Sequence, residues 1–192
     1  MTELEVIAGL MARGVPLHVA QGMAANMIAE SGLNPGVNEK NPLVPGSRGG
    51  FGLNQWTGPR RTQFEAFAND RGADPADPNT QLDFTMWELR NSEKKAGDKL
   101  FSAPDAVTAA EIYSNDFLRP GIPHMDRRIA EARRLAGMGG NDLAKAADAP
   151  KPETNADRVN QIQTLQQRFA YNNFQLDPQA FMRAIPNNLR GV

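Results

Sequence analysis

The chain has 192 residues, with 21 Lys and Arg against 22 Asp and Glu, two His and no Cys. The length suits one domain of roughly 100–150 residues plus an extension, and the near-neutral charge argues against a nucleic-acid-binding protein, which usually has a basic excess. Without cysteine there can be no disulfide, thiol nucleophile or thiolate zinc site, and with only two histidines we expect no metal and no cofactor.

Apolar residues recur at helical spacing along the first 137 residues, and the sequence contains no convincing alternating strand. Gly32 is expected to end the second helix, because glycine readily adopts the left-handed conformation that follows many helices. Thr57, Thr80 and Ser102 are the expected N-caps of three later helices. The sequence thus predicts an all-α fold, with helices over residues 4–11, 16–31, 57–68, 80–89, 102–119 and 123–137. The expected inward residues of the last helix are Met125, Ile129, Ala132 and Ala136.

The composition changes after residue 137. Residues 138–157 are rich in Gly, Ala, Asp, Lys and Pro and are predicted to be a flexible linker. Residues 158–192 carry four Arg against one Asp and are predicted to form a helical tail. The narrow apolar seam of this tail consists of Val159, Ile162, Leu165 and Phe169. Because about 35 residues bury little apolar surface by themselves, the tail either folds back on the domain of residues 1–137 or docks onto another protein.

Glu30 is the best candidate for a reactive group. It shares one helical stripe with Met23 and Met27, so we expect it to face the interior or a cleft. It also lies in the last turn of its helix, where the negative end of the helix dipole disfavours a carboxylate. Burial and dipole both favour the protonated acid, and cleavage of a glycosidic bond requires such an acid to protonate the leaving oxygen. The alternative is a surface carboxylate at a helix end.

A long loop rich in glycine and proline follows this helix and ends in a second motif. Residues 50–56 read Gly-Phe-Gly-Leu-Asn-Gln-Trp. Gly52 lets the backbone approach a ligand closely, while Asn54 and Gln55 offer amide groups to the hydroxyl and N-acetyl groups of sugars. Trp56 is either a flat apolar platform for a pyranose ring or a core side chain. These residues are predicted to bind substrate, and hydrogen bonding within the loop is the alternative for the two amides.

The two motifs together resemble the phage tail lysozyme family, which is related to goose-type lysozymes and soluble lytic transglycosylases. The resemblance rests on Glu30-Ser31-Gly32 with Asn34-Pro35, and on Gly-Phe-Gly-Leu-Asn-Gln-Trp-Thr with two arginines after it. It continues in residues 81–84 and 117–123 and covers residues 3–137. It implies a lysozyme-like helical fold with a substrate cleft, peptidoglycan as the substrate and attachment to a virion.

The resemblance also implies roles for single residues. Glu30 matches the family's general acid, and Gln55 with its glycine-rich turn matches the substrate-lining motif of the lytic transglycosylases. Asn54 departs from that motif, in which a methionine usually precedes the glutamine, so the detailed contacts of those enzymes are not assigned to it. Tyr113 most simply packs in the core, although a tyrosine late in such domains can line the cleft near the acid.

A second carboxylate would separate two mechanisms. An inverting hydrolase needs a base roughly 6.5–9.5 Å from the acid to activate water, whereas a lytic transglycosylase can use one Glu as acid and then as base, forming a 1,6-anhydro product. The candidates are Asp83, Glu39 and Glu88. Asp83 is equally explained by a capping box with Thr80, and Glu39 could reach the cleft from the long loop. Since the family resembled is a lysozyme, hydrolysis is favoured.

The sequence therefore predicts a virion-associated lysozyme that cleaves the glycan strand between N-acetylmuramic acid and N-acetylglucosamine during phage genome delivery. The alternatives are a lytic transglycosylase, a structural tail protein that keeps only the fold, and a lysis enzyme with a wall-binding C-terminus. No stretch reaches the roughly 20 apolar residues that span a bilayer, and the acidic N-terminus does not resemble a signal peptide. We expect synthesis in the host cytoplasm, assembly into the phage tail, and peptidoglycan and other virion proteins as partners.

Overall fold

The structure, a computed structural model, describes residues 1–42 and 44–138. As predicted, this part of the chain is all-α, with seven α-helices, one π-helix, no strand and two isolated β-bridges. The elements are α1 (Glu3–Met11), α2 (Leu17–Ser31), α3 (Gly58–Asn69), α4 (Pro78–Arg90), α5 (Lys94–Phe101), α6 (Ala106–Ile112), η1 (Tyr113–Leu118) and α7 (Met125–Ala136). None of these helices is long and apolar enough to cross a membrane. The predicted linker of residues 138–157, apart from Met138, and the predicted tail of residues 158–192 lie outside the described residues.

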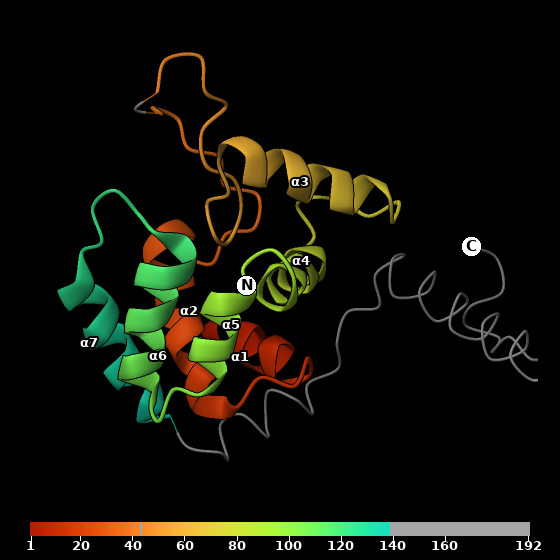
Figure 1. Cartoon of the computed structure of the whole chain (residues 1–192). Coiled ribbons are helices and arrows are strands. Elements are labelled where there is room, and N and C mark those ends of the chain that lie inside the picture. The colour runs from red at the N-terminus through yellow and green to blue at the C-terminus, as the bar shows by residue number, and fades with distance from the viewer. Residues whose placement is uncertain (43, 139–192) are drawn as a thin grey trace, which may run out of the picture. The chain divides into compact units, whose positions relative to one another are not determined.

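Helix α2 is the centre of the fold. Every residue from Val19 to Met27 is buried, and α1, α6 and α7 all pack against this helix (Figure 1). Helix α6 approaches so closely that a Cβ added to Gly22 would lie 2.6 Å from the carbonyl oxygen of Ala106. Gly32 ends α2 with a left-handed φ of 59°, as predicted. Glu30 therefore projects from the last turn of a helix that is packed on all sides.

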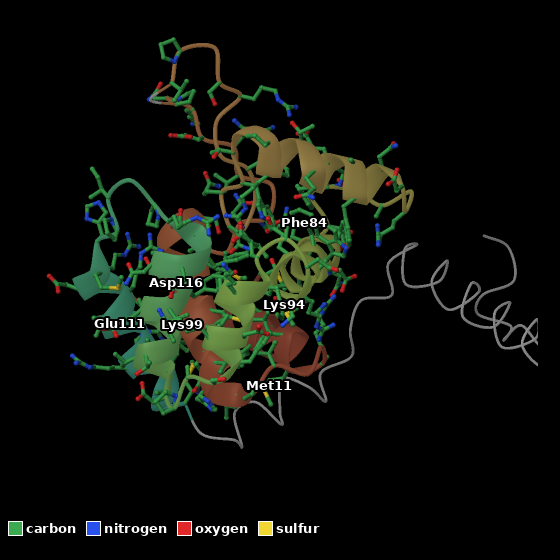
Figure 2. The ribbon with its side chains drawn as sticks, viewed as in Figure 1. Met11, Phe84, Lys94, Lys99, Glu111 and Asp116 are labelled. Atoms are coloured by element: carbon green, nitrogen blue, oxygen red, sulfur yellow. The ribbon has the colours of Figure 1, made fainter. Side chains whose placement is uncertain are left out.

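A second buried helix, α4, attaches α3 through an aromatic cluster. Phe84 lies between the two helices (Figure 2), and its ring centroid is 5.3 Å from that of Phe64 and 5.2 Å from that of Phe67 on α3. Trp56, just before α3, stacks on Phe64 at 4.7 Å. Aromatic rings bury large apolar areas, and such pairs add to that gain. The cluster thereby fixes the glycine-rich segment of residues 50–56, which leads into α3.

Two predicted helix starts are wrong by three residues. Helix α4 is capped by Asp77, whose carboxylate accepts a hydrogen bond from the backbone amide of Thr80. Helix α6 is capped by Asp105 and not by Ser102. In both cases an aspartate, which is at least as good an N-cap as Ser or Thr, lies one turn away from the predicted hydroxyl residue. Thr57 does occupy the cap position of α3, although its side chain makes no capping hydrogen bond.

The chain after α4 is more divided than predicted. The sequence predicts no helix over residues 94–101, where the structure has α5. The buried residues of α5 are Ala96, Gly97 and Leu100; two of them are small, so the apolar signal is weak. The predicted helix of residues 102–119 is α6 followed directly by the π-helix η1. An ion pair of 2.6 Å between Lys99 Nζ and Asp116 Oδ2 links η1 to α5 (Figure 2).

The buried face of α7 differs from the predicted stripe. Ala132 is buried as predicted, but Ala136 is exposed, and the other buried residues are Arg128 and Leu135. Arg128, Ala132 and Leu135 share one stripe, because steps of four and three residues keep to one helix face. The sequence favours the neighbouring stripe because arginine is normally assigned to the exposed side. The prediction thus fails at the residue of α7 that contacts Glu30.

Candidate active site

Glu30 lies at the end of α2 with part of its carboxylate open to solvent. The side chain is 15 % exposed, and its Oε1 atom accepts a hydrogen bond of 2.7 Å from Nη2 of Arg128 on α7. Met23 and Met27, which share its stripe, are fully buried. Glu30 therefore stands where an apolar helix face meets the surface, and its partner is a cation from another helix.

Arg128 is held from three sides. Its Nη1 donates to Oδ1 of Asn26 at 2.8 Å, and its Nε donates to the carbonyl oxygen of Pro123. Asn26 is fully buried and donates in turn to the carbonyl oxygen of Ala110 at 3.0 Å. These bonds join α2, α6, α7 and the loop before α7 around the carboxylate of Glu30. Neither Arg128 nor Asn26 is among the residues predicted from the sequence; the signal for Arg128 is its position on one helical stripe with the buried Ala132 and Leu135.

The glycine-rich segment forms a tight turn closed by a two-way backbone bridge. Phe51 and Trp56 exchange two hydrogen bonds of 3.1 Å, so residues 52–55 make the turn between them. Gly52 has a φ of +72°, and a Cβ at this position would lie 2.6 Å from the side-chain amide of Gln81. Gly52 is thus required by conformation and by space, because the Gln81 side chain packs against it.

Gln81 fastens this turn to the segment after Glu30. It is fully buried, and its Oε1 accepts a hydrogen bond of 2.8 Å from the amide of Leu53. Its Nε2 donates to the carbonyl oxygens of Pro35 and Pro75, both at 2.7 Å. Ser31 adds a second link, because its hydroxyl donates to the carbonyl oxygen of Leu53 at 3.2 Å. The two sequence motifs, 14 residues or more apart in the chain, are therefore joined directly in space.

Asn54 and Tyr113 are brought together, but inside the protein. Asn54 is 5 % exposed and Tyr113 is fully buried. The Tyr113 hydroxyl donates to Oδ1 of Asn54 at 2.9 Å, and Nδ2 of Asn54 donates to the hydroxyl of Thr85 at 2.8 Å. Burial raises the pKa of Tyr113 well above its ordinary value, and the negative charge of Glu88 adds to this increase. Both side chains have their polar groups engaged within the protein, so this geometry favours a supporting role over the predicted sugar contact.

Trp56 belongs to the core and presents no open ring face. It is 2 % exposed, and its indole N–H donates to Oε2 of Glu88 at 2.7 Å. Glu88 is fully buried and also binds Arg60, whose Nε lies 2.7 Å from Oε1 and whose Nη2 lies 3.0 Å from Oε2. Trp56 therefore has the core position that was the alternative to a sugar platform, because it packs against Phe64 of α3 and Phe84 of α4. Both carboxylate oxygens of Glu88 are bound by Arg60 and Trp56, and the side chain is buried. Glu88 is therefore not accessible as a second carboxylate.

Gln55 is the member of the turn that stays accessible. It is half-buried, and its Nε2 donates to the carbonyl oxygen of Gly52 at 2.9 Å. Its φ of 50° is left-handed, which is uncommon for a residue other than glycine. Such strained conformations persist where the surroundings impose them, and they cluster at ligand sites. Gln55 therefore keeps its place among the predicted substrate-binding residues.

Glu39 lies beside the same turn. Its backbone amide donates to the carbonyl oxygen of Gly50 at 2.7 Å, and its Oε2 accepts from the amide of Gly50 at 2.9 Å. The side chain is partly exposed. A carboxylate that is partly open to solvent thus borders the glycine-rich turn.

Asp83 lies elsewhere. Its side chain is 56 % exposed and pairs at 2.6 Å with Arg13, which follows α1 and precedes the start of α2. Glu30 is at the other end of α2, a helix of 15 residues that spans roughly 22 Å at 1.5 Å per residue. The geometry therefore separates Asp83 from Glu30 and disfavours it as the second carboxylate. The predicted capping box with Thr80 is not formed, because Asp77 caps α4.

Residues 2–138 match the sequence model of a family described as phage tail lysozyme. The chain belongs to the phage tail lysozyme family. The match includes Glu30, the glycine-rich turn and every helix from α1 to α7. It confirms the resemblance on which the predicted family rests, and it gives the described helical domain a lysozyme-like fold.

The chain is also similar to a larger phage protein. It is 30 % identical over 152 residues to morphogenesis protein 1 of Bacillus phage B103. This similarity covers 71 % of the chain and 40 % of that relative, so the chain spans less than half of the relative's length. Both comparisons are with phage proteins, and together they identify the chain as a phage lysozyme-like protein.

Two hollows are present on the described surface. One, of about 360 Å³, is lined by α4 and α5, with Met86 and Phe101 among its residues. The other, of about 450 Å³, is lined by the start of α1 and, at the end of α2, by Ile28, Gly32 and Leu33. Neither Glu30 nor Gln55 lines either of them. The substrate cleft that the family implies therefore stays a prediction for this chain.

Proposed function

We propose that this member of the phage tail lysozyme family is a muramidase that cleaves the peptidoglycan glycan strand between N-acetylmuramic acid and N-acetylglucosamine. The observation that carries the proposal is the position of Glu30, which is partly exposed at a buried helix end and is joined through Ser31 to the glycine-rich turn. Family membership supports the same assignment.

In this proposal Glu30 is the general acid. Cleavage begins when the acid gives its proton to the glycosidic oxygen, and the bond between that oxygen and the anomeric carbon then breaks. Only Oε1 of Glu30 binds Arg128, so Oε2 is available to the substrate. Gln55 is the proposed contact of the turn with the sugar, because its side chain is accessible and its amide can both donate and accept.

Glu39 is the proposed second carboxylate. It borders the turn that bears Gln55 and is partly exposed, whereas Asp83 pairs with Arg13 near the start of α2. If Glu39 activates a water on the opposite face of the sugar from Glu30, the product keeps a reducing end. The second candidate function is lytic transglycosylation, in which Glu30 acts alone; the accessible Gln55 in the turn that matches the transglycosylase motif favours it.

The proposed setting is the phage particle. The family description and the morphogenesis protein of phage B103 support a role in the virion, where the enzyme would open the cell wall for genome delivery. Peptidoglycan is the proposed substrate. Other virion proteins are the proposed partners of the predicted tail of residues 158–192.

The test is to incubate the full chain with purified peptidoglycan and identify the released fragments by mass spectrometry. Reducing ends identify a hydrolase, and 1,6-anhydro ends identify a transglycosylase. Glu30→Gln should abolish both products, and Glu39→Gln should lower hydrolysis by roughly 100-fold or more if Glu39 is the base. Asp83→Asn is the matched control and should leave the rate unchanged. An inactive wild-type protein would instead support a structural tail protein.

A further inference from the structure

The carboxylate of Glu30 is held by one oxygen only, and the group that holds it is itself fixed. We propose that Arg128 is a positioning residue, which binds Oε1 of Glu30 so that Oε2 is the oxygen presented to substrate. This inference rests on the proposed role of Glu30 as the acid. Within residues 1–42 and 44–138, the single hydrogen bond to the Glu30 carboxylate is the 2.7 Å bond from Nη2 of Arg128 to Oε1.

Arg128 has little freedom to move. Its side chain is 4 % exposed, and its three guanidinium nitrogens each donate to a different acceptor, on Pro123, Asn26 and Glu30. A guanidinium group is planar and rigid, so two anchored nitrogens determine where the third one points. Asn26 cannot shift easily either, because its Nδ2 donates to the carbonyl oxygens of Gly22 and Ala110. The direction of the Nη2–Oε1 bond is therefore set by α2, α6 and the loop before α7.

A second Arg–Glu pair in the same domain, Arg60 with the buried Glu88, has a different geometry. In the Arg60–Glu88 pair both carboxylate oxygens are occupied: Oε1 by Nε of Arg60, and Oε2 by Nη2 of Arg60 and the indole of Trp56. Glu88 is fully buried. Glu30 has the opposite arrangement, with a buried partner, one bound oxygen and a side chain that is 15 % exposed. A buried ion pair often adds little net stability, so stability alone does not account for the Arg128–Glu30 pair. Because Arg128 binds one oxygen of Glu30 and leaves the other open, the geometry favours a role of Arg128 in orienting the carboxylate.

The arrangement also decides where the transferable proton is carried. Oε1 accepts a hydrogen from Arg128, so in the acid form of Glu30 the proton belongs on Oε2. In the first step the Oε2–H bond breaks, a bond forms between that proton and the glycosidic oxygen, and the electron pair of the glycosidic bond goes to the leaving oxygen. Arg128 contacts neither the proton nor the sugar. It keeps Oε2 pointing in one direction, as an effective near-attack geometry requires.

The experiment compares Arg128→Met, Arg128→Lys and Arg128→Ala with Arg134→Met in the full chain. Arg134 lies on the same helix and pairs with Glu3 and Glu131, but its side chain is 46 % exposed, so it controls for the loss of an ion pair on α7. The readouts are kcat and KM on solubilised glycan strands, the melting temperature, and the response of each variant to added guanidinium chloride at concentrations below those that unfold it.

For Arg128→Met we expect kcat to fall by about 10- to 100-fold while KM stays within about threefold of the wild-type value, because binding is kept and orientation is lost. Arg128→Lys should restore only part of kcat, since an ammonium group cannot bind three fixed acceptors at once. Free guanidinium should raise kcat of Arg128→Ala, in which the shortened side chain leaves room for the ion, and an equal concentration of sodium chloride should not. Arg134→Met should match the wild type.

The inference is overturned if folded Arg128→Met keeps a kcat within twofold of Arg134→Met. It is also overturned if the loss of kcat follows the melting temperature and guanidinium does not restore the kcat of Arg128→Ala. If Arg128→Met does not fold, Arg128→Lys decides: a wild-type kcat overturns the inference and a lowered kcat at unchanged KM supports it. An inactive wild type, or an active Glu30→Gln, refutes the proposed acid and this inference with it. If Glu30→Gln is inactive while the Arg128 variants are fully active, the positioning role of Arg128 is refuted and the proposed role of Glu30 as the acid is kept.

Discussion

The hydroxyl of Tyr113 donates a hydrogen bond of 2.9 Å to Oδ1 of Asn54 and thereby joins the π-helix η1 to the glycine-rich turn. The connection continues from Asn54 to the hydroxyl of Thr85, which donates to the backbone carbonyl of Gln81 at 2.8 Å. All four residues are buried. The turn that borders the proposed site is thus supported from behind by a chain of polar contacts, and this chain makes several properties of the protein testable.

Replacing Tyr113 with Phe should destabilise the fold. The substitution keeps the ring that stacks on Phe117 at 4.7 Å but leaves Oδ1 of Asn54 buried without its donor. An unsatisfied buried acceptor costs about 1–3 kcal/mol, which urea denaturation would measure. Thr62→Val removes an exposed hydroxyl and should change the unfolding free energy by less than about 0.5 kcal/mol. Equal losses in the two variants would contradict this prediction.

Stability should decrease at alkaline pH through the same tyrosine. Burial raises the pKa of Tyr113 well above its ordinary value in the folded state, whereas an unfolded tyrosine titrates near about 10. Above that pH the unfolded chain releases a proton that the folded protein retains, so the free energy of unfolding falls as pH rises. Urea midpoints between pH 8 and 11 would show the decrease, and it should be smaller in Tyr113→Phe. Parallel pH curves for the two proteins would refute the assignment to Tyr113.

Removing the cation from the buried Arg60–Glu88 pair should be costly. Glu88 has a side chain that is 1 % exposed, so Arg60→Met leaves a carboxylate buried without its counter-charge. Breaking such a pair costs about 3–5 kcal/mol, again measurable by urea denaturation. Lys94→Met removes an exposed pair with Asp98, in which the side chains are 63 % and 66 % exposed, and should cost no more than about 1 kcal/mol. If both variants lost a similar amount of unfolding free energy, the prediction would be contradicted, because water would then reach the Glu88 carboxylate once Arg60 is removed.

Two glycines with left-handed backbones should respond differently to alanine. Gly14, with a φ of +86°, has no atom within 4 Å of an added Cβ, whereas at Gly52 the Cβ would meet the Gln81 amide at 2.6 Å. Gly14→Ala should therefore show only conformational strain of about 1–2 kcal/mol. Gly52→Ala adds displacement of Gln81, which binds Leu53 and Pro35, and should lose at least about 1 kcal/mol more together with activity on peptidoglycan. Identical melting temperatures would contradict the close approach.

Sequence patterns could predict much of the fold because helices leave periodic signals. The all-α class, the end of α2 at Gly32 and the cap position of Thr57 follow from apolar spacing and from residues with strong local preferences. The proximity of Glu30 to the glycine-rich turn was implied by the family resemblance, and the bonds of Ser31 and Gln81 explain it physically. Helix starts were less predictable, because aspartates one turn away compete for the cap.

The polar parts of the site could not be predicted from the sequence alone. Asn54 and Trp56 have the chemistry of sugar-binding residues, but whether a side chain faces a ligand or the core depends on partners far away in the chain, here Tyr113 and Glu88. Arg128 was hidden for the opposite reason: a lone arginine is expected to be solvated. Its burial becomes favourable only because Asn26, Glu30 and Pro123 converge on it after folding.

The burial of the middle of α2, from Val19 to Met27, has a consequence for how the proposed site responds to thermal fluctuation. Backbone amides within Val19 to Met27 can exchange with solvent only when α1, α6 and α7 separate from this helix, so they should be among the slowest in the domain. The turn with Gln55 is fastened to the helix end by single bonds from Ser31 and Gln81, which can open and reform locally. Glu30 lies one turn beyond the buried stretch, in the half-buried end of α2. We therefore expect amide exchange to become faster from Met27 through Glu30 to the turn, so that the proposed site lies at the edge of the slow-exchanging core and not inside it.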